Sequence, residues 1–372
     1  MEKTFTREDT KAMKGIAVIM LLVGHLWPFM DRHPAGFEWT APFGLYDPRW
    51  IEIIGWAAHI TLYVFLFLGG YGLYHQIKRG TKLHEVLLGL YRNFWKVFVI
   101  MIPIAFIFFS NQPSDFLSDT SLCSRYADFS LRDLAMNFLG LEFTYNSEWW
   151  FITAYAAAIV TGYLLILALG RSRSFWVDAA AVTVLGVLII VINSLKSSGH
   201  ALSALGDNFI FYYLFNSSAV PFYMGIVFAK HNGLARLRAL LERYTKPGRA
   251  LIALIGLFLI FVIRQTEAVT YDMDVLIVPF FVVLCMTLVD LLPAVKKALA
   301  YLGRHCNNIW LVHSFYCYYF YAATRLVYCT TDAVLSLLIL LGLSLGSSIA
   351  IDGFYSALRK LSSRLKKTTV KA

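Results

Sequence analysis

Long apolar runs recur along almost the whole of this 372-residue chain and constrain its fold more than any other feature. Hydrophobic residues make up 58% of the sequence, whereas charged residues make up 15%, too few to cover the surface of a water-soluble protein of this length. Many runs approach the ~20 residues that a helix needs to cross a bilayer. Because lipid offers no partner to an open strand edge, each run is expected to be a helix.

The sequence therefore predicts an all-α, polytopic integral membrane helix bundle of about ten transmembrane helices, forming a single domain over residues 1–372. The expected spans lie near residues 13–29, 57–75, 94–110, 149–169, 175–192, 209–229, 250–266, 275–292, 306–328 and 333–354. Such spans leave only short connections, so no separate soluble catalytic module is expected. Within the longer connection 111–148, residues 131–139 are predicted to form a short interfacial helix.

Lys and Arg are unevenly divided between the two sets of connecting segments. With the N-terminus in the cytoplasm, most of the 33 Lys and Arg fall in the cytoplasmic segments 1–14, 78–96, 170–174, 230–249, 293–304 and 359–372. Positive residues accumulate on the cytoplasmic side of membrane proteins, so both termini are predicted to be cytoplasmic. The same distribution accounts for the net charge of +10, and nucleic acid is not an expected partner.

The five cysteines form no CxxC pair and no metal-ligand spacing, so no metal site is predicted. Cys123 and Cys329 both fall on the outer side in this topology. A disulfide between them and two free, apolar cysteines are both compatible with the sequence. The first apolar run is too long for a cleavable signal peptide and lacks a small-x-small site before Pro28.

Two ionisable residues lie on one face of the first span. Lys14 and His25 are eleven residues apart, and at about 100° per residue this separation comes within about 20° of three full turns. Ionisable side chains inside a span are costly and are functional candidates by default. A neutral imidazole at His25 is suited to remove a proton from a hydroxyl. The alternatives are a lysine that snorkels at the helix end and a histidine packed between helices.

Several segments of the chain resemble the acyltransferase 3 family of membrane acyltransferases. The stretch KGIAVIMLLVGH, from Lys14 to His25, resembles the start of that family's first span. Segments YVFLFLGGYGLYHQI and EWWFITAYAAAIV are similar to its second helix and to the opening of its fourth. LGRHCNNIWLVHSFY resembles its late Gly-x-x-Ser-x-x-Ile-Tyr-Leu-x-His pattern, with Trp310 and His313 at the last two marked positions.

This resemblance implies a membrane O-acyltransferase. The expected reaction moves an acyl group, commonly acetyl, from cytoplasmic acyl-CoA to a hydroxyl of an envelope or exopolysaccharide sugar or of its lipid-linked precursor. The donor is a substrate, and no tightly bound cofactor is implied. The expected location is the bacterial inner membrane, with multiple passes. The family's paired Arg-x-x-Arg has its nearest match in Arg92 and Lys96, which are four residues apart instead of three.

Candidate site residues follow from these two lines of argument. His25 is the predicted catalytic residue, either as general base or as a transient acyl carrier. Cations at the cytoplasmic side, Lys14, Arg92 and Lys96, are predicted to bind the phosphates of CoA. The candidate substrate-binding residues are His313, Glu148, Trp149 and His59. For His313 a satisfied buried histidine remains open, and for Trp149 an aromatic belt position does.

Two other functional classes stay open on the sequence alone. A transporter or flippase for a lipid-linked saccharide needs gating elements and often has repeated halves, and no internal symmetry is visible. A glycan polymerase or ligase is also polytopic and often carries a large outer loop, for which segment 111–148 is modest in length.

Overall fold

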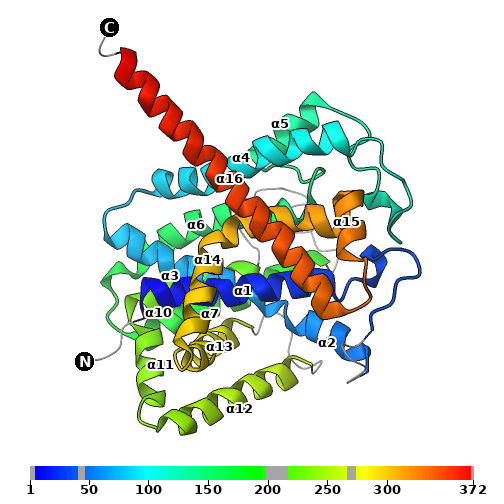
Figure 1. Cartoon of the computed structure of the whole chain (residues 1–372). Coiled ribbons are helices and arrows are strands. Elements are labelled where there is room, and N and C mark those ends of the chain that lie inside the picture. The colour runs from blue at the N-terminus through cyan, green and yellow to red at the C-terminus, as the bar shows by residue number, and fades with distance from the viewer. Residues whose placement is uncertain (1–4, 41–46, 198–216, 266–273, 370–372) are drawn as a thin grey trace. The chain divides into compact units, whose positions relative to one another are not determined.

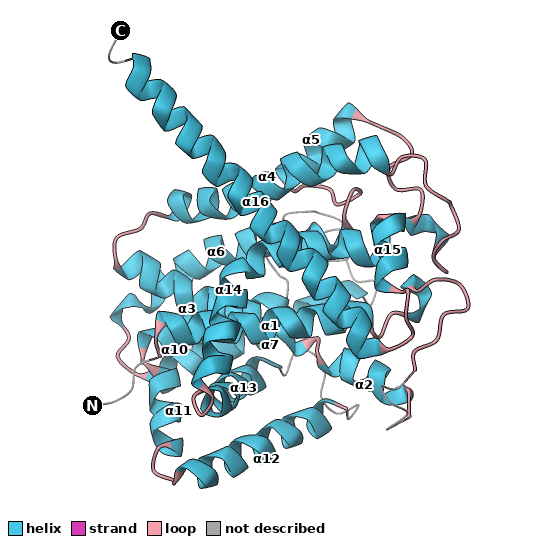
Figure 2. Ribbon diagram, in the orientation of Figure 1, coloured by secondary structure: helices cyan, strands magenta, loops and turns pink. Residues whose placement is uncertain are grey.

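The computed structural model describes residues 5–40, 47–197, 217–265 and 274–369. Helices and their connecting loops make up these ranges, with no β-strand among them, as Figure 2 shows. The α-helices are α1 (Arg7–Leu26), α2 (Arg49–Ala57), α3 (Ile60–Lys78), α4 (Leu83–Phe108), α5 (Leu131–Leu139), α6 (Trp150–Ala168), α7 (Phe175–Ser197), α10 (Val220–Lys230), α11 (Gly233–Leu241), α12 (Lys246–Arg264), α13 (Asp274–Val289), α14 (Pro293–Ser314), α15 (Tyr321–Val327) and α16 (Ala333–Thr369). The all-α prediction is confirmed.

The chain divides into two compact units, each assembled from three separate stretches. The first unit contains Met1–Gly24, Ile53–Tyr91 and Trp149–Arg304. The second contains His25–Glu52, Arg92–Glu148 and His305–Ala372. Both units draw on the N-terminal and the C-terminal halves of the sequence, so residues far apart in the chain become neighbours within each.

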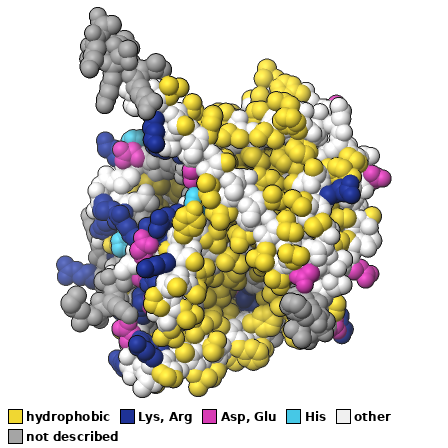
Figure 3. Space-filling view, viewed as in Figure 1, with side chains coloured by type: hydrophobic (Ala, Val, Ile, Leu, Met, Phe, Trp, Pro, Cys, Tyr) yellow, Lys and Arg dark blue, Asp and Glu magenta, His cyan; other side chains and the backbone are white. Residues whose placement is uncertain are grey.

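Six helical stretches in the described ranges are long and apolar enough to cross a membrane. They are Arg49–Lys78, Leu83–Phe108, Ser147–Ala168, Phe175–Leu195, Lys246–Arg264 and Ala333–Ser363, and the apolar helices α10 and α13 are shorter. Hydrophobic side chains cover much of the face drawn in Figure 3. The chain is therefore a multi-pass membrane protein. The expected number of about ten spans is not confirmed, and the orientation of the termini stays a prediction.

Several expected spans begin or end at different residues in the structure, or are interrupted there. The span expected near 57–75 corresponds to α3, which a turn at Ala58 and His59 separates from α2. Residues 209–216 of the span expected near 209–229 lie outside the described residues, and α10 forms most of the remainder. In the range 306–328, α14 is followed by the π-helix η8 (Phe315–Tyr319) and then by α15.

The interruption after η8 has a local cause in the second unit. Phe320 has extended backbone geometry between the two helices. Gln112 stabilises the break, because its amide nitrogen donates to the carbonyl of Tyr319 at 2.9 Å and its amide oxygen accepts from the backbone nitrogen of Tyr321 at 3.1 Å. The Phe320 ring also stacks on Phe109, with centroids 4.0 Å apart. A buried break in a helix requires such substitute partners for its backbone groups.

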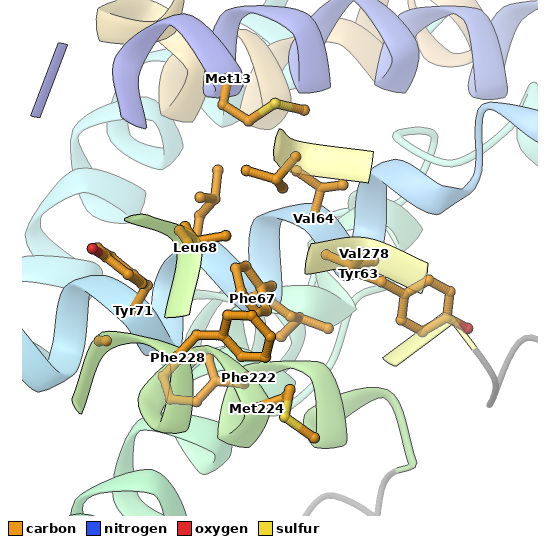
Figure 4. Close-up of a cluster of buried hydrophobic side chains, with 14 of the residues drawn as sticks. Met13, Tyr63, Val64, Phe67, Leu68, Tyr71, Phe222, Met224, Phe228 and Val278 are labelled. Carbon is orange, nitrogen blue, oxygen red and sulfur yellow. The ribbon is translucent and has the colours of Figure 1, made fainter. Parts of the chain in front are cut away.

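Close packing of α3 against α10 forms the centre of the first unit (Figures 1 and 4). A Cβ atom added at Gly70 would lie 1.8 Å from the carbonyl oxygen of Phe222, and one at Gly225 would lie 2.0 Å from that of Phe67. Glycine on both helices therefore allows their backbones to approach, as small residues commonly do in membrane helix pairs.

A short helix of the second unit is bonded to one of its longer helices. Helix α5 covers Leu131–Leu139, as predicted, because Ser130 caps its first turn and Gly140 ends it in the left-handed conformation. Trp95 of α4 donates to the carbonyl of Phe138 in α5 at 2.9 Å. Cys123 and Cys329 are both free cysteines, so no disulfide joins them.

Candidate active site

His25 lies in the last turn of α1, where the sequence specifies both ends of the helix. At the start, the backbone nitrogen of Asp9 donates to Thr6 Oγ1 at 3.1 Å, and the backbone nitrogen of Thr6 donates to Asp9 Oδ2 at 2.8 Å. This reciprocal pair is a capping box, which satisfies donors that the first turn would otherwise leave unpaired. At the other end Pro28 cannot continue the helix, which stops at Leu26.

A carboxylate and a guanidinium lie beside the His25 imidazole in the second unit. His25 Nδ1 is 3.6 Å from Glu148 Oε2, and Glu148 Oε1 accepts a hydrogen bond from Arg32 Nη1 at 2.9 Å. The side chains of His25 and Glu148 are 16% and 10% exposed, so the pair is largely shielded from solvent. A carboxylate in this position favours the tautomer with a proton on Nδ1 and stabilises a positive charge on the ring.

Arg32 belongs to the 3₁₀ turn η1 (Met30–Arg32), which follows α1. Its guanidinium lies 4.4 Å from the centre of the Phe29 ring and 5.2 Å from that of Tyr318. Burial disfavours the charged form of Arg32, but Tyr318 and the Glu148 carboxylate outweigh this effect, and the Arg32 pKa lies above its usual value. The guanidinium therefore remains a permanent positive charge beside Glu148.

His313 of α14 is the second imidazole at this place. Its ring centroid lies 4.8 Å from that of His25, with the planes at 61°. His313 is fully buried, and its Nδ1 lies 2.6 Å from the carbonyl oxygen of Trp310. A carbonyl oxygen only accepts, so Nδ1 carries the proton and Nε2 holds the lone pair of the neutral ring. Nε2 has no hydrogen-bond partner among the described residues.

The turn that carries Glu148 is fastened to the helix that carries His313. Asn146 Nδ2 donates to Ser314 Oγ at 2.7 Å, and the backbone nitrogen of Glu148 donates to Asn146 Oδ1 at 3.1 Å. Asn146 and Ser314 are both fully buried. A buried network of this kind, with its members satisfied, fixes side-chain positions. The predicted residues His25, Glu148 and His313 thus come together.

The remaining predicted residues lie elsewhere in their units. In the first unit, His59 stacks on Trp56 with centroids 5.1 Å apart, Trp149 is 1% exposed, and Lys14 is partly exposed on α1. In the second unit Arg92 is exposed on α4, and Lys96 is partly buried one turn further along.

Comparison with protein families gives one match to almost the whole chain. The family model described as an acyltransferase domain, that of the acyltransferase 3 family, matches residues 9–353. The chain belongs to the acyltransferase 3 family. Comparison with curated proteins and with solved structures finds no match. The chain is therefore a membrane acyltransferase, and the expected family resemblance is confirmed.

Sequence reasoning missed three side chains at the site of this acyltransferase. Arg32 and His33 were visible only as two polar residues in an outer loop, and Tyr318 only as one of several tyrosines in an apolar run. A signal for Arg32 was available, because this cation lies next to the end of the span that carries the candidate base His25. Tyr318 gave no such signal, because its direction depends on the π-helix η8.

Proposed function

We propose that this acyltransferase moves an acetyl group from cytoplasmic acetyl-CoA to a hydroxyl of an envelope or exopolysaccharide sugar, or of its lipid-linked precursor, with His25 as the general base. The observation that carries the proposal is the pairing of His25 with Glu148, and of Glu148 with Arg32, in a chain that belongs to an acyltransferase family. The proposed location is the bacterial inner membrane.

The proposed chemistry begins with proton removal from the acceptor hydroxyl. With the Nδ1 proton directed at Glu148, His25 Nε2 holds the lone pair and takes the hydroxyl proton as the oxygen attacks the thioester carbonyl carbon. The new C–O bond forms, and the C–S bond of the tetrahedral intermediate then breaks. The imidazolium returns its proton to the departing thiolate, so the products are the ester and free CoA thiol.

Glu148 is assigned to orient His25 in this proposal, instead of binding the sugar directly. One of its oxygens is turned to His25 and the other is held by Arg32. The carboxylate then stabilises the imidazolium that forms during attack, and Arg32 prevents the carboxylate from turning away. General base catalysis of this type contributes about 10²–10⁴-fold to a rate.

His25 as a covalent acyl carrier is the chemical alternative. In that route His25 itself attacks the thioester and releases CoA before the acceptor hydroxyl reacts. The shielded carboxylate next to Nδ1 suits either route, and the order of product release separates them: the carrier route releases CoA without any acceptor.

Lys14, Arg92 and Lys96 are proposed to bind the CoA phosphates. Lys96 has a defined environment in the second unit, because its ammonium lies 5.9 Å from the centre of the Tyr355 ring and its backbone carbonyl accepts a hydrogen bond from the Tyr355 hydroxyl at 3.2 Å. Arg92 is on the same face of α4, four residues earlier. Two cations so spaced suit a diphosphate.

For the acceptor sugar, His313 is proposed to contact the reacting groups through the lone pair of its Nε2. Its Nδ1 proton is already donated to the carbonyl oxygen of Trp310. His59 and Trp149 stay weaker candidates for sugar contact. The buried Trp149 ring would have to become exposed before a sugar could stack on it.

The decisive experiment compares envelope glycans from cells with and without the gene by mass spectrometry. The expected result is a loss, in the deletion strain, of the mass of one acetyl group on each modified sugar, restored by the wild-type gene and not by a His25→Ala variant. Unchanged glycan mass with altered export would favour a transporter. Altered chain length with unchanged sugar mass would favour a polymerase.

A further inference from the structure

The carbonyl oxygens of the last two residues of α1, His25 and Leu26, each accept a hydrogen bond from a side chain. The last four carbonyls of any α-helix lack partners within the helix, and an unpaired carbonyl is costly in a membrane protein. The Tyr318 hydroxyl donates to the carbonyl oxygen of His25. His33 Nε2 lies 2.8 Å from the carbonyl oxygen of Leu26 and donates to it. The backbone of the proposed base is thus held from two sides.

His33 is itself fixed by an aromatic enclosure. Its ring is 1% exposed and lies 5.7, 5.3 and 5.3 Å, between centroids, from Phe37, Trp39 and Tyr328. Burial lowers the pKa of His33 to about 4, so the ring is neutral at physiological pH. A neutral ring that donates through Nε2 has a lone pair on Nδ1, and Nδ1 has no partner in the described part of the chain. His33 thus acts as a donor and not as a base.

Tyr318 contacts the candidate site through its hydroxyl and through its ring. It lies in the π-helix η8, a form that commonly occurs at functional positions. Its hydroxyl reaches the His25 carbonyl, and its ring lies beneath the Arg32 guanidinium at 5.2 Å. Arg32 holds Glu148, and Glu148 faces the His25 ring. Tyr318, Arg32 and Glu148 therefore connect the backbone of His25 to its own side chain through a series of contacts.

We infer that Tyr318 and His33 are positioning residues that hold His25 in line with Glu148 for acyl transfer. This inference rests on the proposed role of His25 as base. Neither residue touches the reacting atoms: each acts on the backbone of the turn that carries His25. A misplacement of about 1 Å lowers the rate of a reaction by up to about 10²-fold, because the reacting groups must already be aligned. Loss of either donor is therefore expected to lower kcat and to leave donor binding intact.

The first test removes only the Tyr318 hydroxyl. In the purified full-length protein, Tyr318→Phe is expected to lower kcat about tenfold, with the KM for acetyl-CoA within about twofold of wild type. Tyr316→Phe is the matched control, because Tyr316 lies in the same π-helix and its hydroxyl bonds Ser347 Oγ instead of α1. Equal kcat values for the two variants, or a Tyr318→Phe change confined to KM, would overturn the inference.

The second test separates two properties of His33, its aromatic ring and its hydrogen-bond donor. His33→Phe keeps an aromatic ring in the enclosure and loses the donor, whereas His33→Gln keeps a donor. His33→Gln is expected to retain several-fold more activity than His33→Phe, at equal amounts of folded protein. The opposite order would assign His33 to packing alone and overturn its positioning role. If wild-type protein transfers no acyl group, the proposed function fails; if wild type is active and these variants are too, only this inference fails.

Discussion

Two polar clusters of this acyltransferase differ in how completely their charges are paired. In the first unit, Asp9 accepts from Arg238 at 3.2 Å and from Lys296, and Asp290 accepts from Arg238 and, at 2.7 Å, from Lys296. Burial raises the Asp9 pKa, but the bonds from Lys296 and Thr6 outweigh it, and the pKa lies below its usual value. Two carboxylates and two cations thus satisfy one another.

The cluster around His25 in the second unit is not closed in this way. Glu148 has one oxygen bonded to Arg32 and the other 3.6 Å from His25, and the buried Nε2 of His313 has no partner in the described ranges. A buried polar atom without a partner costs about 1–3 kcal/mol. Such a cost is commonly retained where the atom serves a reaction.

The two clusters therefore differ in how their polar atoms are paired, although similar residue types form both. The first cluster connects α1, α11 and α14 to Asp290, which directly follows α13, and each of its two carboxylates is paired with both cations. In the cluster around His25, His313 Nε2 has no partner among the described residues, and Glu148 is proposed to orient His25. Variants in the first cluster should therefore change stability, and variants in the second should change catalysis.

The largest expected effect is that of His25→Ala. Without the base, acyl transfer should fall by at least about 10³-fold, because both proton transfers depend on the same imidazole. The measurement is the turnover of acetyl-CoA with glycan acceptor, at membrane abundance matched to wild type.

A histidine of another buried ion pair provides the control for that variant. His231 Nε2 lies 2.7 Å from Asp178 Oδ2 in the first unit, and Lys230 pairs with the same carboxylate. His231→Ala is expected to lower the unfolding temperature and to keep kcat near wild type. Retained activity in His25→Ala would remove the base assignment.

Arg238→Met should have the largest effect on stability. Arg238 is 6% exposed, and its removal leaves Asp9 and Asp290 with Lys296 as their remaining cation. Breaking a buried ion pair in this way costs about 3–5 kcal/mol. Thermal unfolding in detergent should show a marked fall in the transition temperature, while the folded fraction keeps its kcat.

Arg132→Met is the exposed counterpart of that change. Arg132 pairs with Glu142 at 2.6 Å, but its side chain is 69% exposed. An exposed pair contributes about 0–1 kcal/mol, so its unfolding temperature should stay close to that of wild type. Equal losses in the two Arg variants would contradict the distinction between a buried closed cluster and a surface pair.

Glu148→Gln should lower kcat by about 10²-fold, because a carboxamide keeps the shape of the side chain but not the charge that stabilises the imidazolium. Single-turnover rates measure the effect directly. Glu242→Gln is the comparison, since Glu242 also faces an arginine, Arg238, at 3.8 Å but belongs to the first unit. A Glu148→Gln enzyme with the wild-type rate would separate Glu148 from the chemistry.

The sequence was sufficient for the parts of this molecule that depend on local pattern. Apolar runs predicted the helices, and Ser130 and Gly140 delimit the predicted helix at 131–139. The family followed from local motifs. In each case the determining residues are close together in the chain.

Contacts between distant segments could not be predicted in this way. Glu148 faces His25 because the turn at Asn146 is bonded to Ser314, and Tyr318 reaches His25 because a π-helix redirects it. Neither contact corresponds to a periodic pattern of residues in the sequence. The break at Phe320 likewise depends on Gln112, a residue of the connection 111–148, whereas the hydrophobic run alone predicted a continuous span.

The smallest expected effect on the reaction concerns binding of the donor and not the base. Lys14→Ala should raise the KM for acetyl-CoA about tenfold with kcat almost unchanged, because a charge-assisted bond to phosphate contributes about 1.5–3 kcal/mol when shielded and less when exposed. Lys14→Arg keeps the charge and should lie between wild type and Lys14→Ala. Lys11→Ala is the matched control, since Lys11 lies one turn earlier on α1 and pairs with Glu8 at 2.6 Å. Equal KM values for Lys14→Ala and Lys14→Arg would argue against phosphate binding and would place Lys14 with the lysines that only anchor a helix end.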